Sequence, residues 1–159
     1  PAIRGVVEVL ATLSLLASLV IVIMELSANE KAIRSATASD VALSLSSWYS
    51  NLGLERVGGA IFRKGMREPE LLAEEELADF LYLLHGAMLL YQNAFVLGQE
   101  GTLDSSLKAV TLGTISAVID QPGFQLYWSQ RQTVFTRSFR EYINQLESQD
   151  DSKLTKMYK

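Results

Sequence analysis

Few side chains in this sequence could take part in chemistry, and they lie far apart. His85 is the only histidine, and the residues three and four positions away from it are Leu81, Tyr82, Met88 and Leu89. A metal site on a helix requires carboxylates or further histidines at those spacings, and none is present. We therefore predict that His85 is a structural residue and that the chain holds no metal.

The acidic run Glu74-Glu75-Glu76, with Asp79 close behind it, is the densest group of carboxylates. Consecutive positions on a helix point to different sides, so these four carboxylates cannot converge on one cation. Near a helix N-terminus the same charges are stabilised by the helix dipole. The run is therefore predicted to form the first turn of a helix.

Motifs for nucleophilic catalysis and phosphate binding are also missing. The serines of Ser44-Leu45-Ser46-Ser47 do not lie in a G-x-S-x-G turn, and the chain contains no G-K-[ST] phosphate loop. Because there is no cysteine, a disulfide, a thiolate zinc site and a cysteine nucleophile are excluded. We predict that the protein is not an enzyme and uses no cofactor.

The charge of the chain bears on its partners. The sequence has 14 Lys and Arg against 18 Asp and Glu, a formal net charge of −4, and the basic residues are spread along it. Binding a phosphate backbone requires a basic face. We therefore expect no nucleic-acid partner.

The most distinctive segment is the apolar run VLATLSLLASLVIVIM, from Val9 to Met24. The 20 residues from Gly5 to Met24 rise about 30 Å as a helix, which matches the hydrocarbon core of a bilayer. Twelve of them are Val, Leu or Ile, and their favourable transfer outweighs the single Glu8 near the helix end. Residues 1–26 are therefore predicted to be a transmembrane anchor.

Two other interpretations of this segment are weaker. A cleaved export signal needs small residues before the cleavage point, whereas Leu26 occupies the third position before the best candidate site. A buried core helix that is apolar on every side would need covering on every side by the rest of a small chain. We expect a single-pass membrane protein, and Lys31 and Arg34 against Arg4 favour a cytoplasmic bundle.

Small residues on the predicted span could pack against another membrane helix. Ala11, Ser14 and Ser18 fall near one stripe, and the two serines have the spacing that lets helix backbones approach closely. The alternative is that these hydroxyls bond to carbonyls of their own helix. The predicted partners are the lipid bilayer and other membrane protein subunits, or a second copy of the chain.

The remaining chain is expected to form a helical bundle over residues 27–146, with a polar tail over 147–159. The apolar residues Leu77, Phe80, Leu84, Met88, Tyr91 and Phe95 recur at steps of three and four and predict a central helix. Further helices are expected over 54–66, with Val57, Ile61 and Phe62 facing inward, over 105–119, with Asp104 as the N-cap, and over 136–146. A short helix is expected from residue 124, after the turn at 120–123. The fold class is therefore all-α: one N-terminal transmembrane helix followed by a small helical bundle.

Aromatic residues gather in the second half of the chain. Most are expected to form the bundle core, since large rings dominate core packing. Some could instead form an exposed platform or lie at the membrane interface, where Trp and Tyr are common. On that alternative, the candidate partner surface comprises Trp48, Tyr127, Trp128 and Arg131.

Several spaced motifs resemble those of small bacterial proteins of unknown function that have one N-terminal span and a helical domain. The residues concerned are Ile61-Phe62-Arg63-Lys64-Gly65, Glu68-Pro69-Glu70-Leu71 with Glu75, Glu76 and Phe80, then Tyr91-Gln92, and finally Gln121-Pro122-Gly123 with Trp128, Phe135 and Phe139. The resemblance implies the anchored helical architecture and no particular activity.

These observations favour a membrane-anchored accessory or scaffold subunit that acts by protein–protein contact in a larger membrane complex, for example an energy-converting or photosynthetic one. The alternative is a membrane-tethered sensing or ligand-binding bundle, with a pocket between the central helix and the helix of Trp128. A third hypothesis, an enzyme without a recognised motif, would require charged side chains gathered in a cleft.

Overall fold

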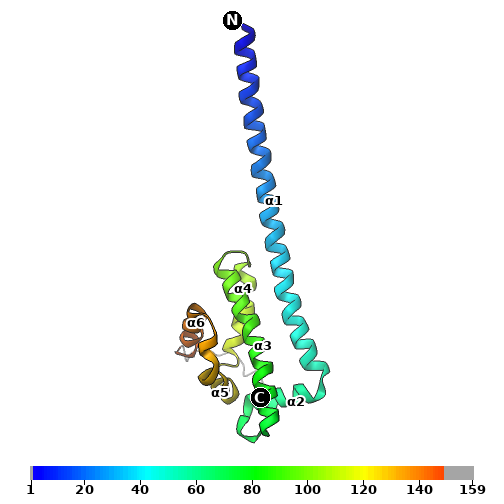
Figure 1. The fold of residues 1–159 in the computed structure, drawn as a ribbon, viewed down its shortest axis with the longest axis vertical. Coiled ribbons are helices and arrows are strands. Elements are labelled where there is room, and N and C mark those ends of the chain that lie inside the picture. Colours follow the sequence, from blue (N-terminus) through cyan, green and yellow to red (C-terminus); the bar gives the residue numbers. More distant parts are fainter. Residues whose placement is uncertain (1, 149–159) are drawn as a thin grey trace. The chain divides into compact units, whose positions relative to one another are not determined.

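A computed structural model describes residues 2–148, and this part of the chain consists of helices joined by short loops, with no strand (Figure 1). The predicted all-α fold, with a long apolar N-terminal helix followed by a bundle, is confirmed. The chain divides into two compact units, residues 1–36 and 37–159. Most of the predicted polar tail, residues 149–159, lies outside the described residues.

The first unit consists of the N-terminal part of helix α1 (Ala2–Leu54). Every side chain that is described between Ile3 and Ala36 is exposed. The helix is unbroken at Ser27-Ala28-Asn29-Glu30, where the sequence has the form of a capping box, so no new helix begins there.

The second unit contains the end of α1, from Thr37, and all the later helices. They are α2 (Arg56–Arg67), η1 (Pro69–Leu71), α3 (Glu74–Gln99), α4 (Ser105–Ser116), α5 (Pro122–Arg131), η2 (Gln132–Val134) and α6 (Arg137–Ser148). The helices expected near 54–66, 105–119 and 136–146 are present with shifted ends. Pro122 lies in the first turn of α5, where its missing N–H removes no hydrogen bond.

Helix α3 supplies the largest part of the core, as its spacing predicts. Phe80, Leu84, Met88, Tyr91 and Phe95 are buried and belong to one apolar cluster with residues of α2, α4, α5 and α6. The acidic run forms the first turn of α3, where Glu76 Oε2 accepts a hydrogen bond from the Ala73 backbone N–H at 3.0 Å. The prediction for this run is therefore confirmed.

Helix α4 begins with a side-chain cap. Asp104 Oδ1 accepts hydrogen bonds from the backbone N–H groups of Ser106, at 2.9 Å, and Leu107, at 3.2 Å. These bonds stabilise the carboxylate and hold the pKa of Asp104 below its usual value. Gly101, in the loop between α3 and α4, has a φ of 74°, a conformation that favours glycine.

One part of the expected core is wrong. Val57 was expected to face inward with Ile61 and Phe62, yet it is 74% exposed while those two are buried. Val57 shares a helix face with Ile61, four positions later, but it lies in the first turn of α2, ahead of the first buried residue of that helix, Gly59.

Two glycines allow α2, α3 and α5 to pack closely. A Cβ at position 123, at the start of α5, would overlap the carbonyl oxygen of Gly65 in α2. A Cβ at position 65 would overlap the ring of Phe80 in α3. All three residues are buried, so the crossing of these helices depends on the absence of two side chains.

We predict that Gly123→Ala lowers the free energy of unfolding by about 1–3 kcal/mol, because backbone must move to admit the methyl group. The matched control is Gly113→Ala in α4, where an added Cβ has no neighbour within 4 Å. That change should stabilise by about 0.4–1 kcal/mol, since alanine favours helix. Urea unfolding of the full chain in detergent, followed by tryptophan fluorescence, measures both. Equal midpoints for the two variants would contradict the packing described.

Candidate functional site

The residues predicted to pack in the membrane lie on the first unit. Ala11, Ser14 and Ser18 are all exposed within that unit. The Ser18 hydroxyl donates to the carbonyl oxygen of Ser14 at 2.9 Å, and the Thr12 hydroxyl does the same to Glu8 at 2.9 Å. These hydroxyls therefore have acceptors within their own helix, and the small side chains leave room for close approach of a second helix.

The candidate partner surface is not formed by the four residues proposed for it. Tyr127 is 0% exposed and Trp128 is 3% exposed, so both rings belong to the core. Trp48 is half-buried and its Nε1–H donates to the Leu83 carbonyl oxygen at 3.3 Å, whereas Arg131 is exposed. The prediction is therefore corrected for Tyr127 and Trp128.

The polar atom of Trp128 explains why its ring can be buried. Its Nε1–H donates to Asn144 Oδ1 at 2.9 Å, while the ring stacks on Phe135 with centroids 5.5 Å apart. Because its N–H has a hydrogen-bond partner, the indole ring is buried without leaving a donor unsatisfied. The majority interpretation of the aromatic residues, as core, is confirmed for this cluster.

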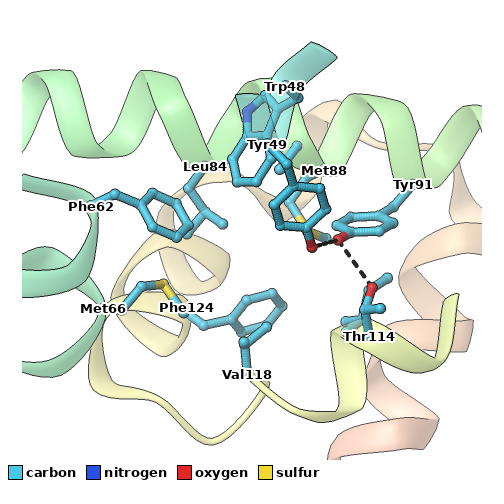
Figure 2. A pocket seen from close by; sticks show the side chains of 12 residues that line it. Trp48, Tyr49, Phe62, Met66, Leu84, Met88, Tyr91, Thr114, Val118 and Phe124 are labelled. Atoms are coloured by element: carbon cyan, nitrogen blue, oxygen red, sulfur yellow. Dashed lines mark hydrogen bonds between the residues drawn. The ribbon is translucent and has the colours of Figure 1, made fainter. Parts of the chain in front are cut away.

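A small cavity lies between α3, α4 and the end of α1, and Figure 2 shows the side chains around it. Its volume is about 30 Å³ and most of its lining is apolar. That is room for about one water molecule and too little for an organic ligand.

Three hydroxyl groups line one wall of this cavity (Figure 2). The hydroxyl oxygen of Tyr91 lies 3.2 Å from that of Tyr49 and 3.0 Å from that of Thr114. The Thr114 hydroxyl also lies 2.7 Å from the Thr111 carbonyl oxygen, which can only accept. The Thr114 hydroxyl has one hydrogen, which it can donate to the Tyr91 hydroxyl or to that carbonyl oxygen, and the hydroxyls of Tyr49 and Tyr91 are hydrogen-bonded to each other. Each of the three hydroxyl groups therefore has a hydrogen-bond partner.

A larger pocket opens on another side of α3. Its volume is about 240 Å³, and it lies between α3 and the segment where α5 passes into η2. The lining consists of Ala78, Leu81, Tyr82, His85, Arg131 and Val134. The ligand-binding alternative predicts a pocket between these two helices. The four residues of α3 are spaced by three, one and three, which places them on one helix face.

His85 connects this pocket to the core. Its Nδ1 lies 2.6 Å from the hydroxyl oxygen of Tyr127, which is fully buried. Burial raises the pKa of the Tyr127 hydroxyl, an effect that the Arg131 guanidinium partly offsets, so the phenol stays protonated. His85 thus has a hydrogen-bond partner in the core, and its place at a pocket was not anticipated.

The charges around the pocket are of one sign. Arg131 lines it, and no aspartate or glutamate does. Among the described residues, no group of three or more His, Asp or Glu side chains is placed to hold a metal ion. The arrangement can bind an anion through fixed donors.

No family model, curated protein or solved structure matches this chain. The resemblance to single-span bacterial proteins therefore rests on the quoted residues alone. Three of these, Gly65, Phe80 and Gly123, meet at the close helix crossing, which gives them a role in packing.

The hydrogen bond to Tyr127 predicts the tautomer of His85. The buried phenol has no other acceptor among the described residues, so it donates to Nδ1 and leaves the ring hydrogen on Nε2. Nitrogen-15 NMR of the full chain at neutral pH should show one imidazole with Nε2 protonated and Nδ1 unprotonated. Tyr127→Phe should remove this preference, and Tyr82→Phe, at an exposed ring, should preserve it. A wild-type ring protonated at Nδ1 would refute the assignment.

Proposed function

We propose that the protein is a single-pass membrane protein whose helical bundle lies on the cytoplasmic side. In this role it serves as an accessory or scaffold subunit of a larger membrane assembly and acts by contact with other proteins. The observation that carries the proposal is the long apolar part of α1, which nothing in its own unit covers.

The apolar segment has the length and composition that an anchor needs. From Leu10 onward α1 is long enough to cross a membrane, with a mean hydropathy of 2.2 over its most apolar 18 residues and none of that window buried. The twelve Val, Leu and Ile residues between Gly5 and Met24 favour insertion by roughly −4 to −7 kcal/mol in total. Glu8 lies near the end of the segment, where its carboxylate can reach the headgroups at reduced cost.

Helix α3 meets the same criteria of length and apolar composition, but its environment differs. Its most apolar window has a mean hydropathy of 1.4 and is 39% buried, with the buried face packed in the bundle core. This helix is accounted for by the core. The difference in burial between α1 and α3 supports one membrane span, in α1.

Contact with other proteins is supported by apolar side chains that the bundle leaves uncovered. Leu54, at the end of α1, is 81% exposed, and Val57, at the start of α2, is nearly as exposed. Two large exposed apolar side chains this close in sequence favour a partner-binding surface where α1 ends and α2 begins. The orientation rests on Lys31 and Arg34, since basic residues favour the cytoplasmic side.

We predict that Leu13→Arg combined with Leu16→Arg releases the chain from membranes. Each arginine costs about 2.5–3.5 kcal/mol at the centre of a span and also removes the favourable transfer of a leucine. Alkaline carbonate extraction of native membranes measures the effect, and the matched control is Leu13→Ile with Leu16→Ile, which should stay in the pellet. Wild-type protein in the soluble fraction would contradict the anchor.

The contact role is tested on the same preparation. Wild-type protein extracted in mild detergent should migrate on a native gel in a complex of defined size, and Leu54→Ser with Val57→Ser should reduce that complex. Val110→Ser, at an equally exposed site on α4, serves as the control. A wild-type chain that migrates only as a monomer would overturn this part of the proposal.

The pocket beside His85 favours a second candidate function, a membrane-tethered bundle that binds a small ligand. Its mostly apolar lining with a few polar groups at one end is typical of ligand sites. This function and the accessory role are compatible, because the pocket lies wholly within the second unit.

A further inference from the structure

The pocket between α3 and the α5–η2 segment limits the size of what it can bind. A cavity of about 150 Å³ holds benzene. The pocket measures about 240 Å³, so a ring of that size fits together with one small polar group. Leu81, Val134 and the ring of Tyr82 offer apolar contacts to such a ring.

The charge of the pocket selects the polar group. Arg131 has a planar guanidinium, which matches a carboxylate with two parallel hydrogen bonds. No ion pair joins Arg131 to a carboxylate of the described residues. The acids of α3 closest in sequence to the lining are Asp79, which is exposed, and Glu76, which pairs with Lys64 at 3.8 Å, and neither lines the pocket.

His85 adds a second donor. Its Nδ1 lies 2.6 Å from the Tyr127 hydroxyl oxygen. In the tautomer predicted above, where the phenol donates to Nδ1, the imidazole has its hydrogen on Nε2, and this N–H is available to a ligand. No carboxylate lines the pocket, and its polar side chains, the Arg131 guanidinium, the His85 imidazole and the Tyr82 hydroxyl, can all donate to an anion.

We infer that this pocket binds a small organic monocarboxylate, with its carboxylate on Arg131 and His85 and its apolar body against Leu81 and Val134. A single fixed positive charge among apolar walls suits one carboxylate better than a phosphate, which has more charge and more acceptors to satisfy. The inference rests on the second candidate function, the ligand-binding bundle, and is independent of the accessory role.

The test is calorimetric titration of the full chain in phosphatidylcholine nanodiscs, with empty nanodiscs subtracted. The probes are benzoate, its neutral isostere benzamide and the cation benzylamine, each up to about 10 mM because ligands of this size bind weakly. Benzoate should bind one to one, and the other two at least about 10-fold more weakly. No benzoate binding, or equal binding of benzamide, would overturn the inference.

Two variants locate the site. Arg131→Gln should weaken benzoate binding about 10- to 100-fold, as expected for loss of a charged hydrogen-bond donor. Arg67→Gln is the matched control, because Arg67 is also an exposed arginine in the last turn of a helix and does not line the pocket. It should leave binding unchanged, and an equal loss in both variants would show that the site lies elsewhere.

A third variant tests the pocket without altering charge. Val134→Trp at an exposed position should fill the pocket and abolish benzoate binding while leaving the unfolding midpoint near that of the wild type. Retained binding would contradict the location. Failure of all benzoate binding in a chain that still migrates in a native complex would refute the carboxylate site and leave the accessory role intact.

Discussion

The apolar side chains between Leu10 and Met24 have no cover within their own unit, and this constraint shapes the whole account. Water does not favour such a surface, since burying one Leu or Ile side chain stabilises by about 1.5–3 kcal/mol. A bilayer covers every side of a helix at once, which a small bundle cannot do. The chain accordingly divides into a unit without a core and a unit with one. The apolar segment of the first unit is a candidate membrane span by its length and composition, and the second unit has a buried apolar core.

Within the bundle, the aromatic rings of α5 pack in the core, whereas Arg131 of the same helix is exposed. Phe124, Tyr127 and Trp128 turn inward from α5, where the two polar rings find partners in His85 and Asn144. Arg131 at the end of the same helix stays outside. The hydrogen bond with Tyr127 occupies His85 Nδ1, and the same histidine lines the pocket. Core packing therefore places the only histidine of the chain beside an exposed arginine.

Local patterns predicted the elements of this fold well. The spacing from Phe80 to Phe95 identified the central helix, and Asp104 marked the start of α4, because both signals lie within a few turns of one helix. Such local patterns do not predict which residues far apart in the sequence contact each other. Nothing near Gly65 indicates that Gly123 will cross it, and nothing near His85 indicates Arg131, 46 positions later. The exposure of Val57 was missed because the sequence does not show where along α2 the packing against the core begins.

The central claim, that the first unit lies in lipid, can be measured residue by residue. The sequence has no cysteine, so single cysteines at positions 10–24 can carry a spin label without background. In phosphatidylcholine vesicles, accessibility to oxygen should exceed accessibility to a water-soluble nickel complex along the segment, with the greatest difference near Ser14 and Leu15. Labels that reach the nickel complex equally at all positions would show a segment in water and contradict the account.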